Sequence, residues 1–191
     1  MYEGLKIGLF GGSFNPAHPG HLHVATSGLR ELGLDHIWWL VSPQNPLKPE
    51  QPSYDSRVET VKALNLPPRM DISHVEKQFG TNYTIDLLRR LKKRYPRTHF
   101  VFMMGADNFA QLPKWRSWQE IMSSFPIAVI SRPGNNIKAR LGQAARQYAD
   151  YRLPEQSAAS LAEMTAPRWT YLTLPLDKRS SSALRVKLAR D

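Results

Sequence analysis

Short apolar runs alternate with stretches of helical spacing along most of the chain. The runs are continuous and rich in Val, Ile, Leu and aromatic residues, which is typical of strands buried on both faces of a parallel sheet. The pattern predicts strands at 6–10, 36–41, 70–73, 99–105, 127–131 and 170–174.

The intervals between these strands carry apolar residues at the spacing of amphipathic helices. Repeated strand–helix alternation predicts an α/β fold, a doubly wound parallel sheet with helices on both faces, of the Rossmann-like type. In such a fold, ligands bind at the carboxyl ends of the strands, near the point where the strand order reverses. The predicted helices are 21–31, 53–64, 84–94, 108–112, 118–123, 137–151 and a last helix at 181–189.

The length of 191 residues suits one domain with a sizeable core, and we find no internal repeat. We therefore expect a single domain over residues 1–191. The stretch YRLPEQSAASLAEMTAPR is polar and contains proline, so we interpret residues 135–167, which include most of it, as a surface excursion before the last strand. Residues 175–191 are interpreted as a C-terminal loop followed by a helix.

The chain contains no cysteine, which excludes disulfides, zinc–thiolate sites and thiol catalysis. No apolar stretch approaches the roughly 20 residues that a membrane-spanning helix needs. The first residues lack the basic and apolar regions of a signal peptide and are better explained as a first strand. Together these features favour a cytoplasmic protein without a membrane partner.

The chain is strongly basic, with a formal net charge of +10, which favours anionic partners. The densest basic run, LLRRLKKRYPR, places Leu88, Leu91 and Tyr95 at helical spacing. We interpret its cations as the solvated face of an amphipathic helix. The alternative, a nucleic-acid-binding module, is disfavoured because the chain has no basic strand interleaved with aromatic residues.

The segment GGSFNPAHPGH, after the first predicted strand, is the first candidate site. Gly11 and Gly12 allow a phosphate to approach backbone N–H groups closely. His18 and His21 are three residues apart, which places both imidazoles on one side of the helix start. Each histidine alone is more typical of a cap or a surface residue, and zinc is disfavoured because His23 diverges from His21 on a helix. The combination indicates an anion-binding site.

The segment KRSSSALR, near the C-terminus, is the second candidate. Ser180, Ser181 and Ser182 lie at the start of a predicted helix, and Arg185 follows them. Serines in such positions are most often ordinary caps. Free N–H groups, the helix dipole and the arginine also suit a bound anion.

These two segments resemble the signatures of the HxGH nucleotidyltransferase superfamily. GGSFNPAHPGH is similar to G-x-F-x-P-x-H-x-G-H, and KRSSSALR to I-S-S-T-x-I-R, with Arg179 and Ser182 as departures. The resemblance implies that His18 and His21 stabilise the α-phosphate region of ATP. It also implies that Mg²⁺ enters with ATP, held mainly by the phosphates rather than by a metal site of the protein. The implied ATP-binding residues are Gly11, Gly12, Ser13, Phe14, Gly105, Asp107, Ser180, Ser181 and Arg185.

Further stretches resemble one branch, the bacterial nicotinate-nucleotide adenylyltransferases. VSPQNPLKP, GTNYTIDLL and MGADNFAQLPKW are similar to the branch patterns P-x-x-x-P-x-K, S-Y-T-x-D-T-L, G-A-D and L-P-x-W, in that order. Leu47, Asn82 and Leu87 depart from the usual residues. The match extends over 8–185 and is weakest at 135–167.

This resemblance implies adenylyl transfer from ATP to nicotinate mononucleotide, which yields deamido-NAD and pyrophosphate in NAD biosynthesis. It implies that the mononucleotide is bound by Lys48, Thr84, Trp115 and Arg132. A purely structural role stays open for Asp107 as a helix cap and for Trp115 as a core residue. The alternative enzyme is another adenylyltransferase of the same fold, such as phosphopantetheine adenylyltransferase.

Overall fold

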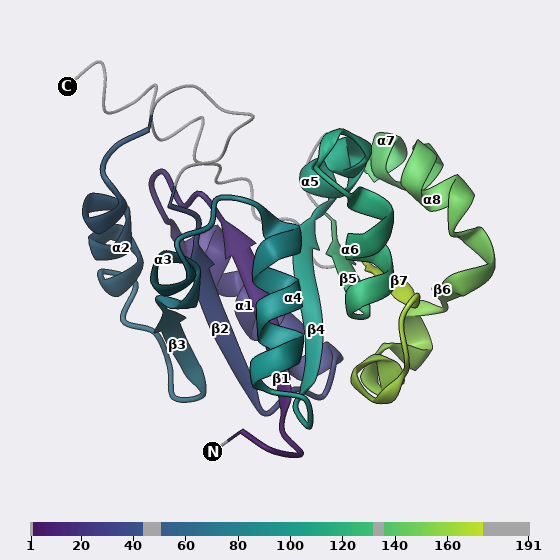
Figure 1. Ribbon diagram of the computed structural model, residues 1–191, viewed down its shortest axis with the longest axis horizontal. Helices are drawn as coiled ribbons and strands as arrows, with labels where there is room; N and C mark the ends of the chain where they lie inside the picture. Colours follow the sequence, from purple (N-terminus) through teal and green to yellow (C-terminus); the bar gives the residue numbers. More distant parts are fainter. Residues whose placement is uncertain (1, 44–50, 132–135, 174–191) are drawn as a thin grey trace.

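A computed structural model describes residues 2–43, 51–131 and 136–173 (Figure 1). Its centre is a seven-stranded sheet in the order β3-β2-β1-β4-β5-β7-β6, with every neighbouring pair parallel. The strands are β1 (Lys6–Gly12), β2 (His36–Val41), β3 (Met70–Ser73), β4 (His99–Gly105), β5 (Ile127–Ile130), β6 (Arg152–Leu153) and β7 (Trp169–Leu172).

Helices cover both faces of this sheet, as the alternating pattern predicts (Figure 1). One face is covered by α4, α5, α6 and α8, and the other by α1, α2 and η3. The α-helices are α1 (Pro19–Glu31), α2 (Tyr54–Lys62), α3 (Val75–Phe79), α4 (Thr84–Arg94), α5 (Ala106–Gln111), α6 (Trp118–Ser124), α7 (Asn136–Leu141) and α8 (Gln143–Gln147); the 3₁₀ helices are η1 (Leu112–Lys114), η2 (Ala149–Tyr151) and η3 (Glu155–Glu163).

The central strands contribute side chains to the hydrophobic cores on both faces of the sheet, because successive side chains of a strand point to opposite faces. In β2, Trp38 and Leu40 pack with the helices of one face, while Ile37 and Trp39 pack with those of the other. All of these side chains are buried. This explains why the strands read as continuous apolar runs rather than as alternating ones.

The strand order reverses at β1, which pairs with β2 on one side and with β4 on the other. Loops leaving the carboxyl ends of β1 and β4 therefore run toward opposite faces of the sheet. A crevice at this edge is the usual ligand site of doubly wound sheets.

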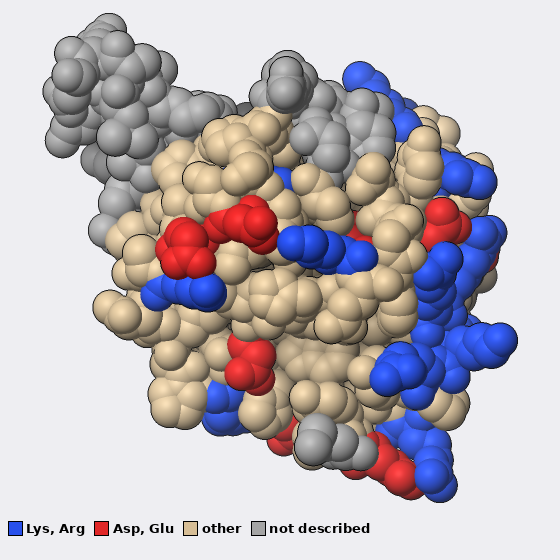
Figure 2. Space-filling model, turned by 60° about the vertical axis from the view of Figure 1, so that its left-hand side comes forward, with Lys and Arg blue, Asp and Glu red and all other residues tan. Residues whose placement is uncertain are grey.

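The predicted strands 36–41, 70–73 and 99–105 and the predicted helix 84–94 coincide with β2, β3, β4 and α4. On α4 the apolar side chains Leu88 and Leu91 are buried, while the cations of 89–94 are exposed, so the interpretation as a solvated face is confirmed. Figure 2 shows how Lys and Arg side chains gather along one side of the molecule.

The predicted helix 137–151 is wrong as one continuous element. It is divided into α7, α8 and η2, and the first break falls at Gly142, whose ψ of 171° is extended. A Cβ there would lie 2.7 Å from the carbonyl oxygen of Lys138, so the close approach requires glycine.

The expected surface excursion at 135–167 instead contributes a strand to the sheet and apolar side chains to the core. The short strand β6 extends the sheet beside β7, and η3 buries Ala158, Leu161 and Ala162 against the core. Small side chains spaced along a 3₁₀ helix allow this close packing but leave little apolar pattern in the sequence. The expected C-terminal loop and helix at 175–191 lie outside the described residues.

Candidate functional site

The histidine motif lies in the connection from β1 to α1. His18 is the last residue before the helix and has an extended backbone, with φ −151° and ψ 163°, and Pro19 begins the helix. The backbone N–H of His18 donates to Nδ1 of His21 at 3.2 Å, and the ring centroids are 3.9 Å apart. The structure thus brings together the two histidines that the sequence singles out.

That hydrogen bond has a chemical consequence for His21. Because Nδ1 accepts a hydrogen bond from the backbone N–H, a neutral His21 carries its own proton on Nε2. Both imidazoles are nearly buried, at 4% exposure for His18 and 5% for His21. A buried, oriented N–H donor of this kind interacts strongly with an anion because little water competes for it.

The ring of Phe14 packs against His21 of the histidine pair. Its φ of 46° turns the side chain into the core, where the ring contacts Phe10, Trp39 and His21 at centroid distances of 5.5, 5.1 and 5.1 Å. A Cβ on Gly12 would lie 2.9 Å from this ring, so glycine is required there. The Phe14 side chain therefore has a packing role, and its backbone is the part left for a nucleotide contact.

Arg57, on α2, joins the loops that follow β1 and β2. Its side chain is 1% exposed and donates four hydrogen bonds to backbone carbonyl oxygens, at Ser13 (2.8 Å), Ser42 (2.7 Å), Pro43 (2.6 Å) and Pro52 (2.9 Å). Burial lowers the pKa of this guanidinium from its usual value. The carbonyl oxygens compensate its lost hydration, which is what a buried charge needs.

Sequence analysis missed Arg57 because one arginine in a basic chain carries no special signal. Its position does carry one: Arg57 is four residues before the buried Val61, so both lie on the core-facing side of α2. A cation on the apolar face of a helix is a candidate for a buried structural role.

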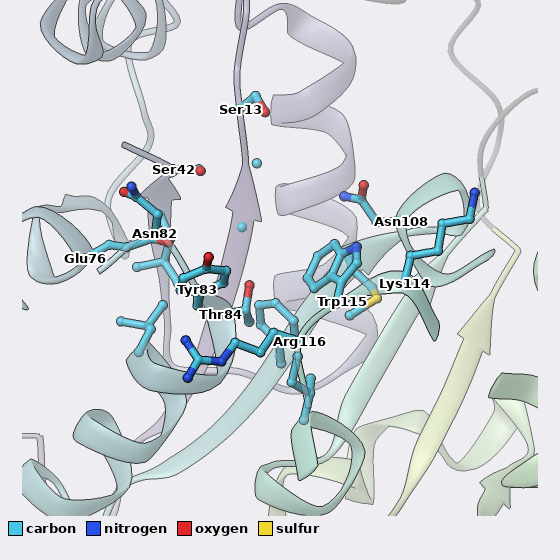
Figure 3. Close-up of a pocket in the computed structure, with 17 residues that line it drawn as sticks. Ser13, Ser42, Glu76, Asn82, Tyr83, Thr84, Asn108, Lys114, Trp115 and Arg116 are labelled. Atoms are coloured by element: carbon cyan, nitrogen blue, oxygen red, sulfur yellow. The ribbon is translucent and has the colours of Figure 1, made fainter. Parts of the chain in front are cut away.

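A cavity of about 470 Å³ opens at the carboxyl edge of the sheet, beside the loop that Arg57 holds (Figure 3). It runs from Glu76 and Asn82 at one end to Lys114 and Trp115 at the other. The lining residues are Gly11, Gly12, Ser13, Leu40, Ser42, Glu76, Asn82, Tyr83, Thr84, Leu87, Phe102, Met104, Asn108, Lys114, Trp115, Arg116 and Ile121.

The walls combine flat aromatic surface with positive charge. Trp115 is half-buried against the core and presents its ring to the cavity. Arg116 lies over the ring of Tyr83, with 4.8 Å between the guanidinium carbon and the ring centroid. Thr84 is the first residue of α4, where backbone N–H groups have no partner within the helix. A planar anion therefore suits this cavity.

The predicted site residues fall into four groups. Gly11, Gly12, Ser13, Thr84 and Trp115 line the cavity, whereas His18 and His21 lie outside its lining, in the adjoining loop. Gly105 is the N-cap of α5, and Asp107 lies in the first turn of that helix. The residue of this turn that lines the cavity is Asn108. Outside the described residues lie Lys48, Arg132, Ser180, Ser181 and Arg185.

Glu76 is a cavity residue that sequence analysis missed entirely. It lies on α3, a short helix that was not predicted, and its side chain is 6% exposed. Burial raises the pKa of this carboxyl to about 8, while the charge of Arg57 opposes the shift. At neutral pH the carboxyl is therefore mostly protonated.

Residues 2–43, 51–131 and 136–173 include no group of three or more His, Asp or Glu placed to hold a metal ion. Nor does any helix in this part of the chain have the length and apolar character to cross a membrane.

Comparison with known proteins agrees with this geometry. The sequence model of the cytidylyltransferase-like family matches residues 9–187. Curated proteins named "probable nicotinate-nucleotide adenylyltransferase" are similar along nearly the whole chain. The protein of Roseobacter denitrificans is 46% identical over 96% of this chain and 93% of its own length, and that of a Caulobacter species is 50% identical over 95% and 97%.

Solved structures agree at the level of the fold. The nicotinic acid mononucleotide adenylyltransferase of Plasmodium falciparum, complexed with NaAD, superposes with a TM-score of 0.73 at 17% identity, covering 95% of this chain and 83% of its own. Its complex with APC gives 0.72. The fold and the histidine motif define a nucleotidyltransferase of the cytidylyltransferase-like family, and within it the chain belongs to the nicotinate-nucleotide adenylyltransferases.

Replacing Arg57 by methionine tests whether its guanidinium holds together the loops that follow β1 and β2. The variant keeps the length of the side chain but leaves four buried or partly buried carbonyl oxygens without their donor, so we expect a loss of about 3 kcal/mol in the free energy of unfolding. Urea unfolding measures it. Arg30→Met is the matched control, because the Arg30 side chain is 78% exposed. Equal stability of the two variants would contradict the role given to Arg57.

Replacing His18 by alanine tests the histidine motif. We expect the rate of adenylyl transfer at saturating substrates to fall by at least ~100-fold, because oriented donors at developing charge typically contribute a few kcal/mol. Pyrophosphate release measures the rate, and a thermal melt checks the fold. His23→Ala, on the helix that follows His18, should stay near the unmodified rate; equal losses in both variants would remove the special role of His18.

Proposed function

We propose that this protein transfers the adenylyl group of ATP to nicotinate mononucleotide, giving deamido-NAD and pyrophosphate. One observation carries the proposal: a cavity with an aromatic face and the N-terminus of α4 in its wall adjoins the buried His18–His21 pair. The curated relatives bear the name of this activity. The absence of cysteine agrees with a cytoplasmic location for the reaction.

The reaction requires positioning rather than a protein nucleophile. A phosphate oxygen of the mononucleotide attacks the α-phosphorus of ATP, and the bond from that phosphorus to the bridging oxygen breaks. Pyrophosphate leaves with the electron pair. The His18 and His21 imidazoles would donate to the α-phosphate region, where negative charge develops, and this lowers the barrier.

The cavity suits the pyridine end of the acceptor. Trp115 would stack on the ring, whose positive charge is attracted to an aromatic face. The N–H groups at the start of α4, next to Thr84, would bind the ring carboxylate. Because an amide offers no anionic oxygen, these donors would favour nicotinate over nicotinamide.

The remaining roles rest on the family resemblance. Ser180, Ser181 and Arg185 would hold the β- and γ-phosphates, and Lys48 and Arg132 the mononucleotide phosphate. The nucleoside of ATP would lie toward Gly105 and Asp107. Mg²⁺ would enter with ATP and neutralise charge on the leaving pyrophosphate, with the ATP phosphates as its main ligands.

Replacing Trp115 by alanine tests the ring site. Loss of the stacking face should raise the KM for nicotinate mononucleotide by ~10-fold, the equivalent of about 1.4 kcal/mol, and leave the KM for ATP within about twofold. Steady-state kinetics with each substrate varied in turn measure both constants. Trp115→Phe, which keeps an aromatic face, should recover most of the affinity. A larger effect on ATP would move the ring site elsewhere.

The proposed activity is tested by pyrophosphate release from Mg-ATP with three acceptors offered separately. Nicotinate mononucleotide should be used far better than nicotinamide mononucleotide, and phosphopantetheine should give no turnover. Preference for the amide would overturn the assignment of the pyridine site. Turnover with phosphopantetheine alone would identify a phosphopantetheine adenylyltransferase. No turnover with any of the three would refute adenylyl transfer to these acceptors.

A further inference from the structure

Glu76 places an acidic group in a cavity that otherwise suits an anion. Its side chain is almost fully buried, yet it lines the same cavity as Trp115, together with Ser42 and Asn82 at one end (Figure 3). An ionised carboxylate here would repel an anionic acceptor through a medium of low dielectric. The cavity therefore needs this carboxyl in its neutral form when such an acceptor binds.

Within residues 2–43, 51–131 and 136–173, the charged groups around Glu76 do not form a close ion pair with it. From α2, Arg57 acts on it electrostatically, but the Arg57 guanidinium is bonded to backbone carbonyl oxygens. Tyr54 of the same helix is hydrogen-bonded to Nδ1 of His74 at 2.6 Å, and Lys77 of α3 pairs with Asp55 at 3.3 Å.

The other neighbouring elements face the cavity with uncharged groups near this end. The β2 side contributes Leu40 and Ser42, and α4 contributes Thr84 and Leu87. On α4, Asp86 is paired with Arg89 at 3.2 Å. Of the cavity cations, Lys114 lies at the Trp115 end, whereas the Arg116 guanidinium lies over the ring of Tyr83 and 3.9 Å from the Asp86 carboxylate.

We propose that Glu76 is a specificity-determining residue for the acceptor: its neutral carboxyl admits an anionic mononucleotide, and its ionised form excludes one. The inference rests on the proposed function, since it takes the acceptor to be nicotinate mononucleotide. Protonated, Glu76 is a hydrogen-bond donor to the acceptor; ionised, it can only accept and repel. Affinity for the acceptor thus depends on one proton.

The sign of the pH dependence follows from burial. Since burial raises the pKa of Glu76 to about 8, the carboxyl is neutral at pH 6.5 and mostly ionised at pH 9.5. If only the neutral form binds, the apparent KM for nicotinate mononucleotide rises by about 30-fold across this interval, because the competent fraction falls to roughly 3%. The rate at saturating acceptor should change far less. Nicotinamide mononucleotide, with one negative charge fewer, should show a smaller rise.

The experiment compares the unmodified enzyme with Glu76→Gln from pH 6.5 to 9.5. Glutamine keeps a donor and cannot ionise, so the rise in KM should disappear in this variant. Glu59→Gln is the matched control, because Glu59 is an exposed residue of α2 paired with Lys62. It should retain the full rise. An identical rise in Glu76→Gln would overturn the inference.

Calorimetry on the unmodified enzyme gives a second test that does not depend on a variant. Binding of nicotinate mononucleotide at pH 8.5 should take up about 0.8 proton per site, because a carboxyl of pKa near 8 must be reprotonated. The dependence of the binding enthalpy on buffer ionisation measures this uptake. Binding without proton uptake would overturn the inference while leaving the proposed function intact. Absence of both binding and turnover at every pH would instead refute the proposed function.

Discussion

The guanidinium of Arg57 is the interaction on which the site geometry depends. It binds carbonyl oxygens of the loops that follow β1 and β2, so two segments far apart in sequence share one rigid junction. A buried cation is tolerated only where its donors are satisfied, and loops are rigid only where their backbone groups are bound. Here the loop carbonyl oxygens satisfy the donors of Arg57, and Arg57 in turn binds the backbone of the loops. Ser13, held through its carbonyl oxygen, lies between the histidine motif and the cavity.

From this junction two chemically different regions extend. On one side the His18–His21 pair is buried, with a backbone hydrogen bond that sets the tautomer of His21. On the other side lies the cavity with Trp115 and the start of α4. The parallel sheet explains their proximity, since strands of one direction bring their carboxyl ends to one edge. Positioning of two substrates, rather than covalent catalysis, is what this layout serves.

The net charge of +10 does not describe the cavity, whose wall contains both basic side chains and an acidic one. Lys114 lies at the Trp115 end and Arg116 over the ring of Tyr83, while Glu76 lies at the end opposite Lys114 and is mostly uncharged at neutral pH because it is buried. The cations of α4, by contrast, face solvent on the outside of the molecule. Surface charge therefore says little about the site, whereas the protonation of one buried group changes its character.

The sequence by itself determined the fold class, most strands and the histidine motif, because each depends on neighbours close along the chain. Continuous apolar runs predict buried parallel strands, and the spacing of His18 and His21 is preserved on any helix start. The family resemblance also pointed to Thr84 and Trp115, which the structure places in one cavity. The ends of strands in a parallel sheet make that convergence predictable.

Only the tertiary structure decided the roles of Arg57 and Glu76, and the breaks in the predicted helix at 137–151. In the sequence, Glu76 is one acid among many, and the place of Arg57 on the apolar face of its helix does not tell which groups it binds. Their properties come from desolvation, which is created when α2 and α3 pack onto the sheet edge. Burial is a property of the assembled fold, so the chemistry that depends on it cannot be derived from residue type and spacing.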